Sequence, residues 1–280
     1  MKVIKSPTEL SEIIRLLKRK GKRVGFVPTM GYLHEGHLSL VRRAQRENDI
    51  VVVSIFVNPT QFGPKEDFKR YPKNLAHDKK LLSRAHINYL FVPSKDSIYP
   101  KGFRAFVSPG LPARYLCGPK RPGHFRGVAT VVKRFFEIVK PHTAYFGEKD
   151  YQQARVIEYM VKRFCLSVKI KTCPIVREAD GLAMSSRNRY LSRAERASAS
   201  SVYRSLLVGR KLIKLGERNV KKIKKAIQDI LRVNITRIDY IELVNSKTCA
   251  PVQRARPPVL IAIACFLGST RLIDNILVKV

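Results

Sequence analysis

Over the first 175 residues, short apolar runs rich in β-branched residues alternate with longer segments of helical spacing. The runs that predict strands are Val24–Val27, Ile50–Val57, Ile87–Val92, Thr143–Phe146 and Val168–Val176. This alternation predicts an α/β fold, with a parallel sheet covered by helices on both faces. In such sheets ligands bind at the carboxyl ends of the strands, near the point where the strand order reverses.

Helical segments are recognised by apolar residues that recur every three or four positions. One such stripe consists of Val128, Val132, Phe135, Phe136 and Val139, and another of Ala154, Ile157, Met160 and Phe164. Near the N-terminus, Ser6, Pro7 and Glu9 supply an N-cap, a proline at the first helical position and a capping-box partner. We therefore expect a helix in this segment rather than a signal peptide.

The pattern changes at about Ser192, which forms a second capping box with Glu195 and opens a helix towards Leu215. A shorter helix is predicted over Arg218–Leu231. Three strand patterns then follow without intervening helices: Ile238–Val244, Val259–Phe266 and Arg271–Val278. We accordingly predict two domains, an α/β domain at residues 1–176 and a smaller α+β domain at residues 177–280 that acts as a lid.

The length of 280 residues exceeds the usual size of one hydrophobic core, so two domains or one large α/β domain are expected from length alone. No apolar run approaches the roughly 18–20 residues that cross a bilayer, so we expect no membrane partner. The cysteines, which lack paired or metal-ligand spacing, are Cys117, Cys165, Cys173, Cys249 and Cys265. Their odd number favours reduced thiols and a cytoplasmic location.

The net charge of +34 is unusual for a protein of this size. The basic excess is spread over both parts of the chain and forms no tail. Its densest cluster, in the predicted helix at 218–231, faces away from an apolar stripe. A solvated helix face explains this cluster, and a nucleic-acid patch is the alternative. We expect no specific nucleic-acid partner, and we expect the positive field to attract anionic substrates.

The first candidate site follows the first predicted strand, in the segment Pro28-Thr29-Met30-Gly31-Tyr32-Leu33-His34-Glu35-Gly36-His37. His34 and His37 are three residues apart where a strand gives way to a helix, so both can lie on one face at the helix N-terminus. That terminus carries partial positive charge and attracts phosphate. Histidines there can donate hydrogen bonds to charge that develops on a phosphate. A turn with two surface histidines is the alternative interpretation.

Two further segments end predicted strands. Asn58 and Gln61 follow the run Ile50–Val57, and their amides suit a small ligand with hydroxyl groups, because an amide both donates and accepts. In Gly147-Glu148-Lys149-Asp150, Lys149 offers a compact positive charge for phosphates. Asp150 can either cap the following helix or accept a hydrogen bond from a ribose hydroxyl.

A fourth segment, Met184-Ser185-Ser186-Arg187, follows Asp180-Gly181 near the predicted domain boundary. Its hydroxyl groups and guanidinium can hold phosphate oxygens. It resembles the Lys-Met-Ser-Lys-Ser loop of nucleotidyl transferases and class I aminoacyl-tRNA synthetases, and His34 to His37 resembles their His-x-Gly-His motif.

These segments resemble those of the pantothenate synthetase family in their order and in their residues. Two further segments share the resemblance: Gly123-His124-Phe125-Arg126-Gly127-Val128-Ala129-Thr130 and Thr270-Arg271-Leu272-Ile273-Asp274-Asn275. The resemblance is strongest over residues 20–195. It implies a Rossmann-like, doubly wound parallel sheet with a smaller α+β domain, and a homodimer formed through the N-terminal domain.

The resemblance also implies an activity. ATP and pantoate would form enzyme-bound pantoyl adenylate and release pyrophosphate, and the amine of β-alanine would then displace AMP to give pantothenate. Such an AMP-forming carboxylate–amine ligase requires no protein nucleophile, because positioning and charge neutralisation suffice for attack at the α-phosphate.

By the same resemblance, the residues expected to bind ATP are Met30, His34, His37, Gly147, Lys149, Asp150, Val176, Met184, Ser185, Ser186 and Arg187. Catalytic roles fall on His34, His37 and Lys149. Pantoate is expected to contact Gln61 and Gln153, with Asn58 nearby. Arg121 and His124 lie in a Gly/Pro-rich stretch that the resemblance suggests as a cover over the site.

Two departures from the family pattern concern particular positions. Cys117 stands in Leu116-Cys117-Gly118, where the family has glutamate. His77-Asp78 stands where the family has an acidic pair, so we expect Asp78 alone to hold Mg²⁺ near the ATP phosphates.

Two other functions remain as alternatives. An adenylyltransferase that moves AMP onto a phosphate acceptor shares the His-x-Gly-His chemistry, but it leaves Gln61 and Gln153 unexplained. A basic RNA-binding protein built on a synthetase-like fold would bind RNA with steep salt dependence and would not turn over ATP.

Overall fold

A computed structural model describes residues 1–64 and 66–279. Its contacts divide the chain into two compact units, neither of them continuous in sequence. The first unit comprises Met1–Gly110, Arg121–Glu148 and Val156–Pro174, and the second comprises Leu111–Lys120, Lys149–Arg155 and Ile175–Val280. The division into continuous domains at 1–176 and 177–280, and the lid role of the second, stay predictions.

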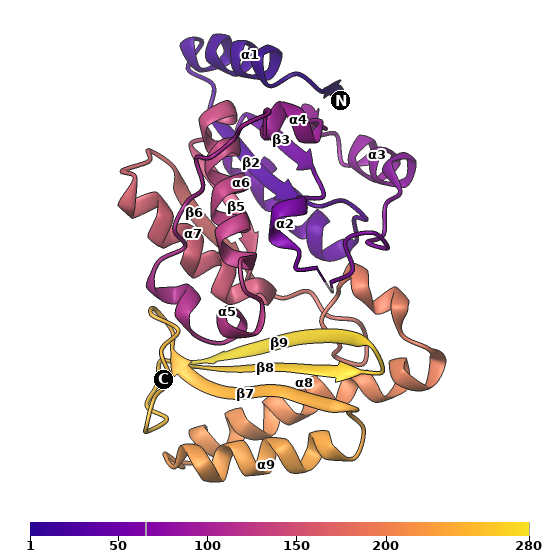
Figure 1. Cartoon of the computed structure of the whole chain (residues 1–280), viewed down its shortest axis with the longest axis vertical. Coiled ribbons are helices and arrows are strands. Elements are labelled where there is room, and N and C mark those ends of the chain that lie inside the picture. The colour runs from indigo at the N-terminus through magenta and orange to yellow at the C-terminus, as the bar shows by residue number, and fades with distance from the viewer. Residues whose placement is uncertain (65, 280) are drawn as a thin grey trace. The chain divides into compact units, whose positions relative to one another are not determined.

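A six-stranded parallel sheet forms the centre of the first unit (Figure 1). Its strands are β1 (Lys2–Ile4), β2 (Val24–Thr29), β3 (Ile50–Ile55), β4 (Tyr89–Phe91), β5 (Thr143–Gly147) and β6 (Lys169–Cys173). They lie in the order β1-β4-β3-β2-β5-β6, so the order reverses between β2 and β5. The loops that leave β2 and β5 therefore start at the topological switch point, where ligands bind in open α/β sheets.

Helices cover both faces of this sheet. They are α1 (Pro7–Arg19), α2 (Glu35–Glu47), α3 (Leu75–Arg84), α4 (Lys95–Ile98) and α6 (His124–Val139), with a 3₁₀ turn at Pro59–Gln61. On one face, Leu40 of α2 and Leu82 of α3 pack with Val27 of β2. On the other, Phe135 and Phe136 of α6 contact Phe26 of β2 edge to face. Because side chains alternate along a strand, neighbouring residues of β2 bury against opposite helical layers.

The first helix begins as its sequence predicts, with Ser6 as N-cap accepting a hydrogen bond from the Glu9 N–H over 3.3 Å. The expected role of Glu9 as capping-box partner is wrong. Its carboxylate pairs with the Lys2 ammonium at 2.8 Å, because β1 brings that cation within reach. The helix packs on α6, where the Ser11 hydroxyl donates to the Ile138 carbonyl over 2.9 Å.

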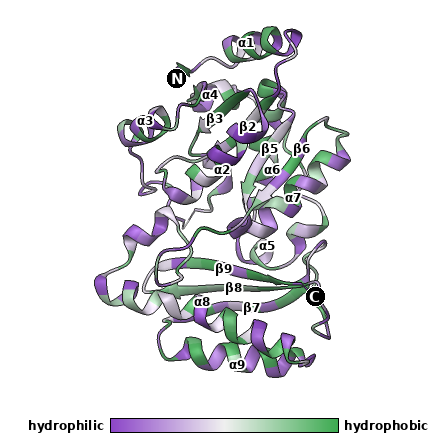
Figure 2. Ribbon diagram, turned by 180° about the vertical axis from the view of Figure 1, so that it is seen from behind, coloured by the Kyte–Doolittle hydropathy of each residue, from purple (hydrophilic) through white to green (hydrophobic). Residues whose placement is uncertain are grey.

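An antiparallel sheet of order β7-β8-β9 forms the centre of the second unit. Its strands are β7 (Arg237–Asn245), β8 (Val259–Leu267) and β9 (Thr270–Val278). Figure 2 colours β8 as hydrophobic along its length, and all but one of its residues are buried. Helices α8 (Arg193–Lys214) and α9 (Val220–Arg232) pack against one face through Leu206, Ile227 and their neighbours.

The remaining elements complete the chain. They are α5 (Cys117–Lys120), α7 (Tyr151–Arg163) and 3₁₀ turns at Leu111–Arg114, Glu148–Asp150 and Ser186–Tyr190. The doubly wound parallel sheet and the smaller α+β part are confirmed, as is the capping box of Ser192 and Glu195. The sequence prediction missed β1 and α3. β1 is a three-residue edge strand, too short for a periodic signal, and α3 has few apolar residues.

Candidate functional site

The loop after β2 is a tight turn held from both sides. Gly31 has φ +82°, and a Cβ there would lie 2.9 Å from Ile55 Cγ2 and 3.0 Å from Asp78 Oδ2. Its N–H donates to Thr29 Oγ1 over 3.1 Å, while that hydroxyl donates to the Ser54 carbonyl. Only glycine meets both the left-handed backbone and the close approach. The turn therefore leads the chain directly from the sheet into α2.

Asp78, on α3, anchors this turn. Its Oδ2 accepts from the Tyr32 N–H over 2.8 Å and its Oδ1 from the Leu33 N–H over 2.7 Å, and the residue is 1% exposed. Mg²⁺ prefers carboxylates that leave it room for several waters. No group of three or more His, Cys, Asp or Glu side chains suited to a metal lies among residues 1–64 and 66–279. The metal role of Asp78 stays a prediction, and in the structure its buried carboxylate accepts from two backbone amides.

His34 and His37 form a reciprocal cap at the start of α2. The His34 Nδ1 accepts from the Gly36 N–H over 3.2 Å, and the His37 Nδ1 accepts from the His34 N–H over 3.3 Å. The two ring centroids are 4.1 Å apart. Because each Nδ1 is an acceptor, each neutral ring carries its proton on Nε2. The pair therefore presents two Nε2–H donors at a helix N-terminus beside the switch point.

Gln61 lies in the turn after β3, next to the β2 loop. Its Nε2 donates to Met30 Sδ over 3.2 Å, and its Oε1 accepts from Asn58 Nδ2 over 3.0 Å. Asn58 is 1% exposed, and its Oδ1 also accepts from the Tyr99 hydroxyl over 2.8 Å. Burial raises the pKa of Tyr99 to about 12, so this hydroxyl keeps its proton. Asn58 is therefore placed to hold Gln61 rather than to meet a ligand itself.

His124, the first residue of α6, holds the main chain at Gln61 by a hydrogen bond. His124 Nδ1 lies 2.8 Å from the Gln61 carbonyl and its Nε2 lies 2.9 Å from Arg121 Nη1. Since a guanidinium only donates, His124 Nε2 accepts and its Nδ1–H donates to Gln61. Arg121 also binds both carboxylate oxygens of Glu66, at 2.6 and 2.7 Å. Burial raises the pKa of Glu66, but the bonds and charge of Arg121 outweigh this and hold it below its usual value.

Gly127 permits this close approach of α6. A Cβ at this position would lie 2.3 Å from the Thr60 carbonyl oxygen and 2.7 Å from the Gln61 nitrogen. Contacts this short are forbidden to any larger residue, so the glycine lets the helix touch the backbone of the turn. The Gly123–Thr130 motif thus serves the Gln61 turn directly.

Gly147 ends β5 at the switch point, and the chain continues through Lys149 and Asp150, which belong to the second unit. Lys149 Nζ lies 3.8 Å from Asp150 Oδ1. Within the described residues, Asp150 makes no capping hydrogen bond to α7, and its ribose role stays a prediction. Gln152 is bound to the backbone of Pro112 and Tyr115, whereas the half-buried Gln153 has no such bond in the described structure.

The fourth segment lies in an arm that we define as residues 176–188. Its two sides pair through the Met184 N–H, which donates to the Val176 carbonyl over 3.0 Å. Ser185 caps the following 3₁₀ turn by accepting from the Arg187 N–H over 3.3 Å, and Ser186 is buried. At the base of the arm, Arg177 binds both carboxylate oxygens of Asp274 at 2.6 and 3.0 Å. The arm is thus tied to β9.

Within the first unit, the structure therefore brings together Met30 with Gln61, and His34 with His37. Within the second, it joins Val176 to Met184 and Ser185 to Arg187. Sequence reasoning missed the residues that support them: Glu66, Tyr99, Glu178, Asn188 and Arg196. The side-chain hydrogen bonds of Glu66, Tyr99 and Arg196 span 16 to 55 positions in the sequence, and only the glycine spacing around Gly127 carried a local signal.

The thiol of Cys117 is buried. Its Sγ lies 3.2 Å from the Tyr240 hydroxyl and 3.6 Å from Arg271 Nη2. Arg271 pairs with the Asp239 carboxylate at 2.7 Å. A carboxylate thus faces this guanidinium from β7.

None of the helices in the described part of the chain is long and apolar enough to cross a membrane.

Comparison with known proteins gives one consistent result. The sequence model described as Pantoate-beta-alanine ligase matches residues 2–277. A protein of Caldicellulosiruptor saccharolyticus named pantothenate synthetase is 55% identical over 281 residues, with complete coverage of both chains. Another protein of that name, from Thermosipho melanesiensis, is 54% identical and covered to 99% on both sides.

Solved structures agree with the sequence relatives. The crystal structure of pantothenate synthetase from Thermus thermophilus superposes with a TM-score of 0.94, at 44% identity and complete coverage of both chains. A pantoate-beta-alanine ligase from Francisella tularensis, complexed with beta-gamma ATP and β-alanine, superposes with a TM-score of 0.82 at 37% identity. That comparison covers 99% of this chain and 97% of the other.

Proposed function

This chain belongs to the pantoate–β-alanine ligase family and is a ligase of that activity, and we propose that it joins its substrates in two chemical steps. In the first, a carboxylate oxygen of pantoate attacks the α-phosphorus of ATP and pyrophosphate leaves, giving pantoyl adenylate. In the second, the β-alanine amine attacks the acyl carbon and AMP leaves, giving pantothenate. Both ATP and β-alanine are named as ligands of the related F. tularensis enzyme, which supports this substrate pair.

The observation that carries the first step is the reciprocal cap of His34 and His37 at the start of α2. Two Nε2–H donors at a helix N-terminus match the negative charge that builds on the phosphates as pyrophosphate leaves. Lys149 adds a positive charge, and the arm adds Ser185, Ser186 and Arg187. These residues position and stabilise the reacting groups, and none of them acts as a nucleophile.

We assign the adenosine part of ATP to Met30, Gly147, Asp150 and Val176, and we assign Met184 to ATP beside the phosphate contacts of the arm. Pantoate is assigned to Gln61 and Gln153, because an amide can both donate to and accept from its hydroxyl groups. The bond of Asn58 to Gln61 supports a role for Asn58 behind that contact, as a residue that fixes the Gln61 amide. ATP is expected to arrive as its Mg²⁺ complex with the ion on the phosphates, and no side-chain ligand is assigned to it.

Further proposals concern the assembly and its location. We infer a homodimer through the first domain and a cytoplasmic location, the latter because the five cysteines are odd in number and lack paired spacing in the sequence. Sedimentation velocity checks the first: a single species of one-chain mass across the working concentration range would contradict it.

Pyrophosphate release by the purified protein tests the two-step scheme. With ATP, Mg²⁺ and pantoate alone, we expect about one equivalent of pyrophosphate per active site and bound adenylate. Adding β-alanine should then permit continuous turnover. Pyrophosphate that appears only when β-alanine is present, even in the first turnover, would contradict a separate adenylation step.

A further inference from the structure

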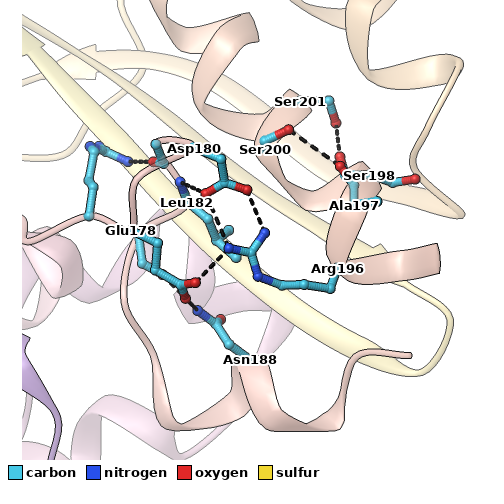
Figure 3. Close-up of polar contacts among 12 residues, drawn as sticks. Glu178, Asp180, Leu182, Asn188, Arg196, Ala197, Ser198, Ser200 and Ser201 are labelled. Atoms are coloured by element: carbon cyan, nitrogen blue, oxygen red, sulfur yellow. Dashed lines mark hydrogen bonds and ion pairs between the residues drawn. The ribbon is translucent and has the colours of Figure 1, made fainter. Parts of the chain in front are cut away.

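Besides Arg177 at its base, the arm at residues 176–188 carries three polar side chains outside the proposed ATP contacts. Glu178 and Asp180 lie near its tip, where Gly181 takes φ +92° and the Glu178 N–H donates to the Leu182 carbonyl over 2.8 Å. Asn188 lies at its far end, just after the segment Met184–Arg187. Figure 3 shows Glu178 and Asp180 directed towards Arg196 of α8, and Asn188 directed towards Glu178.

Arg196 of α8 binds both acidic side chains of the tip (Figure 3). Its Nη2 lies 2.5 Å from Glu178 Oε2, and its Nη1 lies 2.5 Å from Asp180 Oδ2. Nη2 also donates to Asp180 Oδ1 over 3.2 Å. Arg196 therefore holds Asp180 in a bidentate pair and Glu178 in a second, a geometry that the planar guanidinium suits and a lysine cannot reproduce.

Glu178 links Arg196 to Asn188 at the far end of the arm. Its other oxygen, Oε1, accepts from Asn188 Nδ2 over 2.8 Å, and the same amide donates to the Ala183 carbonyl over 3.2 Å. Ala183 and Asn188 flank Met184–Arg187 on either side. The series Arg196–Glu178–Asn188 thus fixes both ends of the segment assigned to the ATP phosphates.

This arrangement is not explained by stability alone. The side chains of Arg196 and Glu178 are each 31% exposed and that of Asp180 is 39% exposed, and pairs so exposed add little to folding. Arg196 also lies near the N-terminus of α8, where the helix dipole disfavours a cation. The hydrogen bonds of Arg196 lower the pKa of Asp180, so the pair is ionised at neutral pH.

We propose that Arg196 is a positioning residue for adenylate formation, holding residues 184–187 in place through Glu178, Asp180 and Asn188. The proposal rests on the proposed function for the identity of the reaction. Arg196 itself touches no substrate. Loss of the anchor should leave the arm attached at its base through Arg177 and Asp274, but with its phosphate-facing segment displaced.

Three variants test this role: Arg196→Ala, Arg196→Lys and, as control, Arg193→Ala, which removes an exposed positive charge from the same helix. Single-turnover pyrophosphate release measures adenylation, and attack of β-alanine on supplied pantoyl adenylate measures the second step. Hydrogen exchange of the backbone amides at residues 183–190 reports the order of the segment without any need for activity.

For Arg196→Ala we expect adenylation to slow by about 10- to 100-fold, as small misplacements of positioning groups do, with the second step changed by less than about threefold. Exchange at 183–190 should rise, and the Tm should fall by no more than about 4 °C. Arg196→Lys should recover part of the adenylation rate, and Arg193→Ala should match the unmodified chain.

Unchanged adenylation and exchange in Arg196→Ala would overturn the proposal, and so would equal losses in both steps together with a large fall in Tm. If the unmodified chain releases no pyrophosphate, the proposed function fails instead. The exchange measurement then still decides whether Arg196 holds the segment.

Discussion

The side-chain amide of Asn275 donates a hydrogen bond to the main-chain carbonyl of Lys149 over 3.0 Å. Its neighbour Asp274 binds Arg177 at the base of the arm. Two consecutive residues of β9 therefore hold two segments that we assign to ATP. Strand geometry makes this possible, because successive side chains of a strand point to opposite faces and one strand can support two different segments.

Asn275→Ala should slow adenylation by about 10-fold or more, because the turn that carries Lys149 loses its side-chain anchor. The unpartnered carbonyl should cost about 1–3 kcal/mol of unfolding free energy. Single-turnover pyrophosphate release and urea unfolding measure the two effects. Asn234→Ala, in the loop after α9, is the matched control. An adenylation rate equal to that of the control would show that this hydrogen bond does not place Lys149.

The two ring nitrogens of His37 should have different roles: Nδ1 caps the helix, and Nε2–H donates to the phosphates. In His37→Asn the amide oxygen can take the place of Nδ1 and keep the cap on the His34 N–H, but no group replaces Nε2–H. In His37→Gln the amide nitrogen can replace that donor while the cap is lost. We expect His37→Asn to stay folded and lose about 10²–10³ in adenylation rate, and His37→Gln to lose less.

The cap itself should be visible in stability. His37→Gln should lower the free energy of unfolding by about 0.5–2 kcal/mol, the usual effect of losing a helix cap, whereas His37→Asn should not. Chemical unfolding of the two variants and the unmodified chain measures this difference. The reverse ranking in both stability and rate would mean that the Nδ1 and Nε2 roles are exchanged.

Site features formed by residues close in sequence were predictable, and contacts between residues far apart in sequence were not. The histidine pair lies within one strand-to-helix junction, so its place at a helix N-terminus was predicted from four consecutive residues. Asp78 binds Tyr32 across 46 positions, and Arg121 binds Glu66 across 55. No local pattern marks such pairs, since each depends on the strand order and on glycines that let backbones approach. The fold was predictable from periodicity, and the supporting contacts of the site were not.

Because Asp78 binds backbone amides, we expect its substitution to change stability rather than the Mg²⁺ requirement. Asp78→Asn keeps one acceptor but places an N–H₂ group against a backbone N–H, which should cost about 1–3 kcal/mol of unfolding free energy. We expect the Mg²⁺ concentration for half-maximal adenylation to stay unchanged, as in the control His77→Ala at the exposed neighbouring position. A severalfold increase in that concentration for Asp78→Asn alone would support the metal role of Asp78 instead.

His142 should make folding sensitive to mild acid. Its Nδ1 accepts from the Val24 N–H over 2.9 Å, which couples the start of β5 to the start of β2. Burial lowers the pKa of His142 below 6.5, and the positive charges of Lys18 and Arg23 lower it further. The folded chain therefore holds this ring neutral at a pH where the unfolded chain protonates it.

Between the two pKa values the unfolded chain binds more protons, so the free energy of unfolding decreases as pH falls from about 6.5 through the lower folded pKa. Above about pH 6.5 the contribution of this group is complete and constant. His142→Asn offers an amide oxygen in place of Nδ1 at every pH, so its stability should lack this component. We expect the difference between the two proteins, on the order of 1 kcal/mol, to develop below pH 6.5 in urea unfolding at matched ionic strength. A difference that is constant from pH 8 to pH 5 would mean that protonation of His142 does not break its bond to Val24.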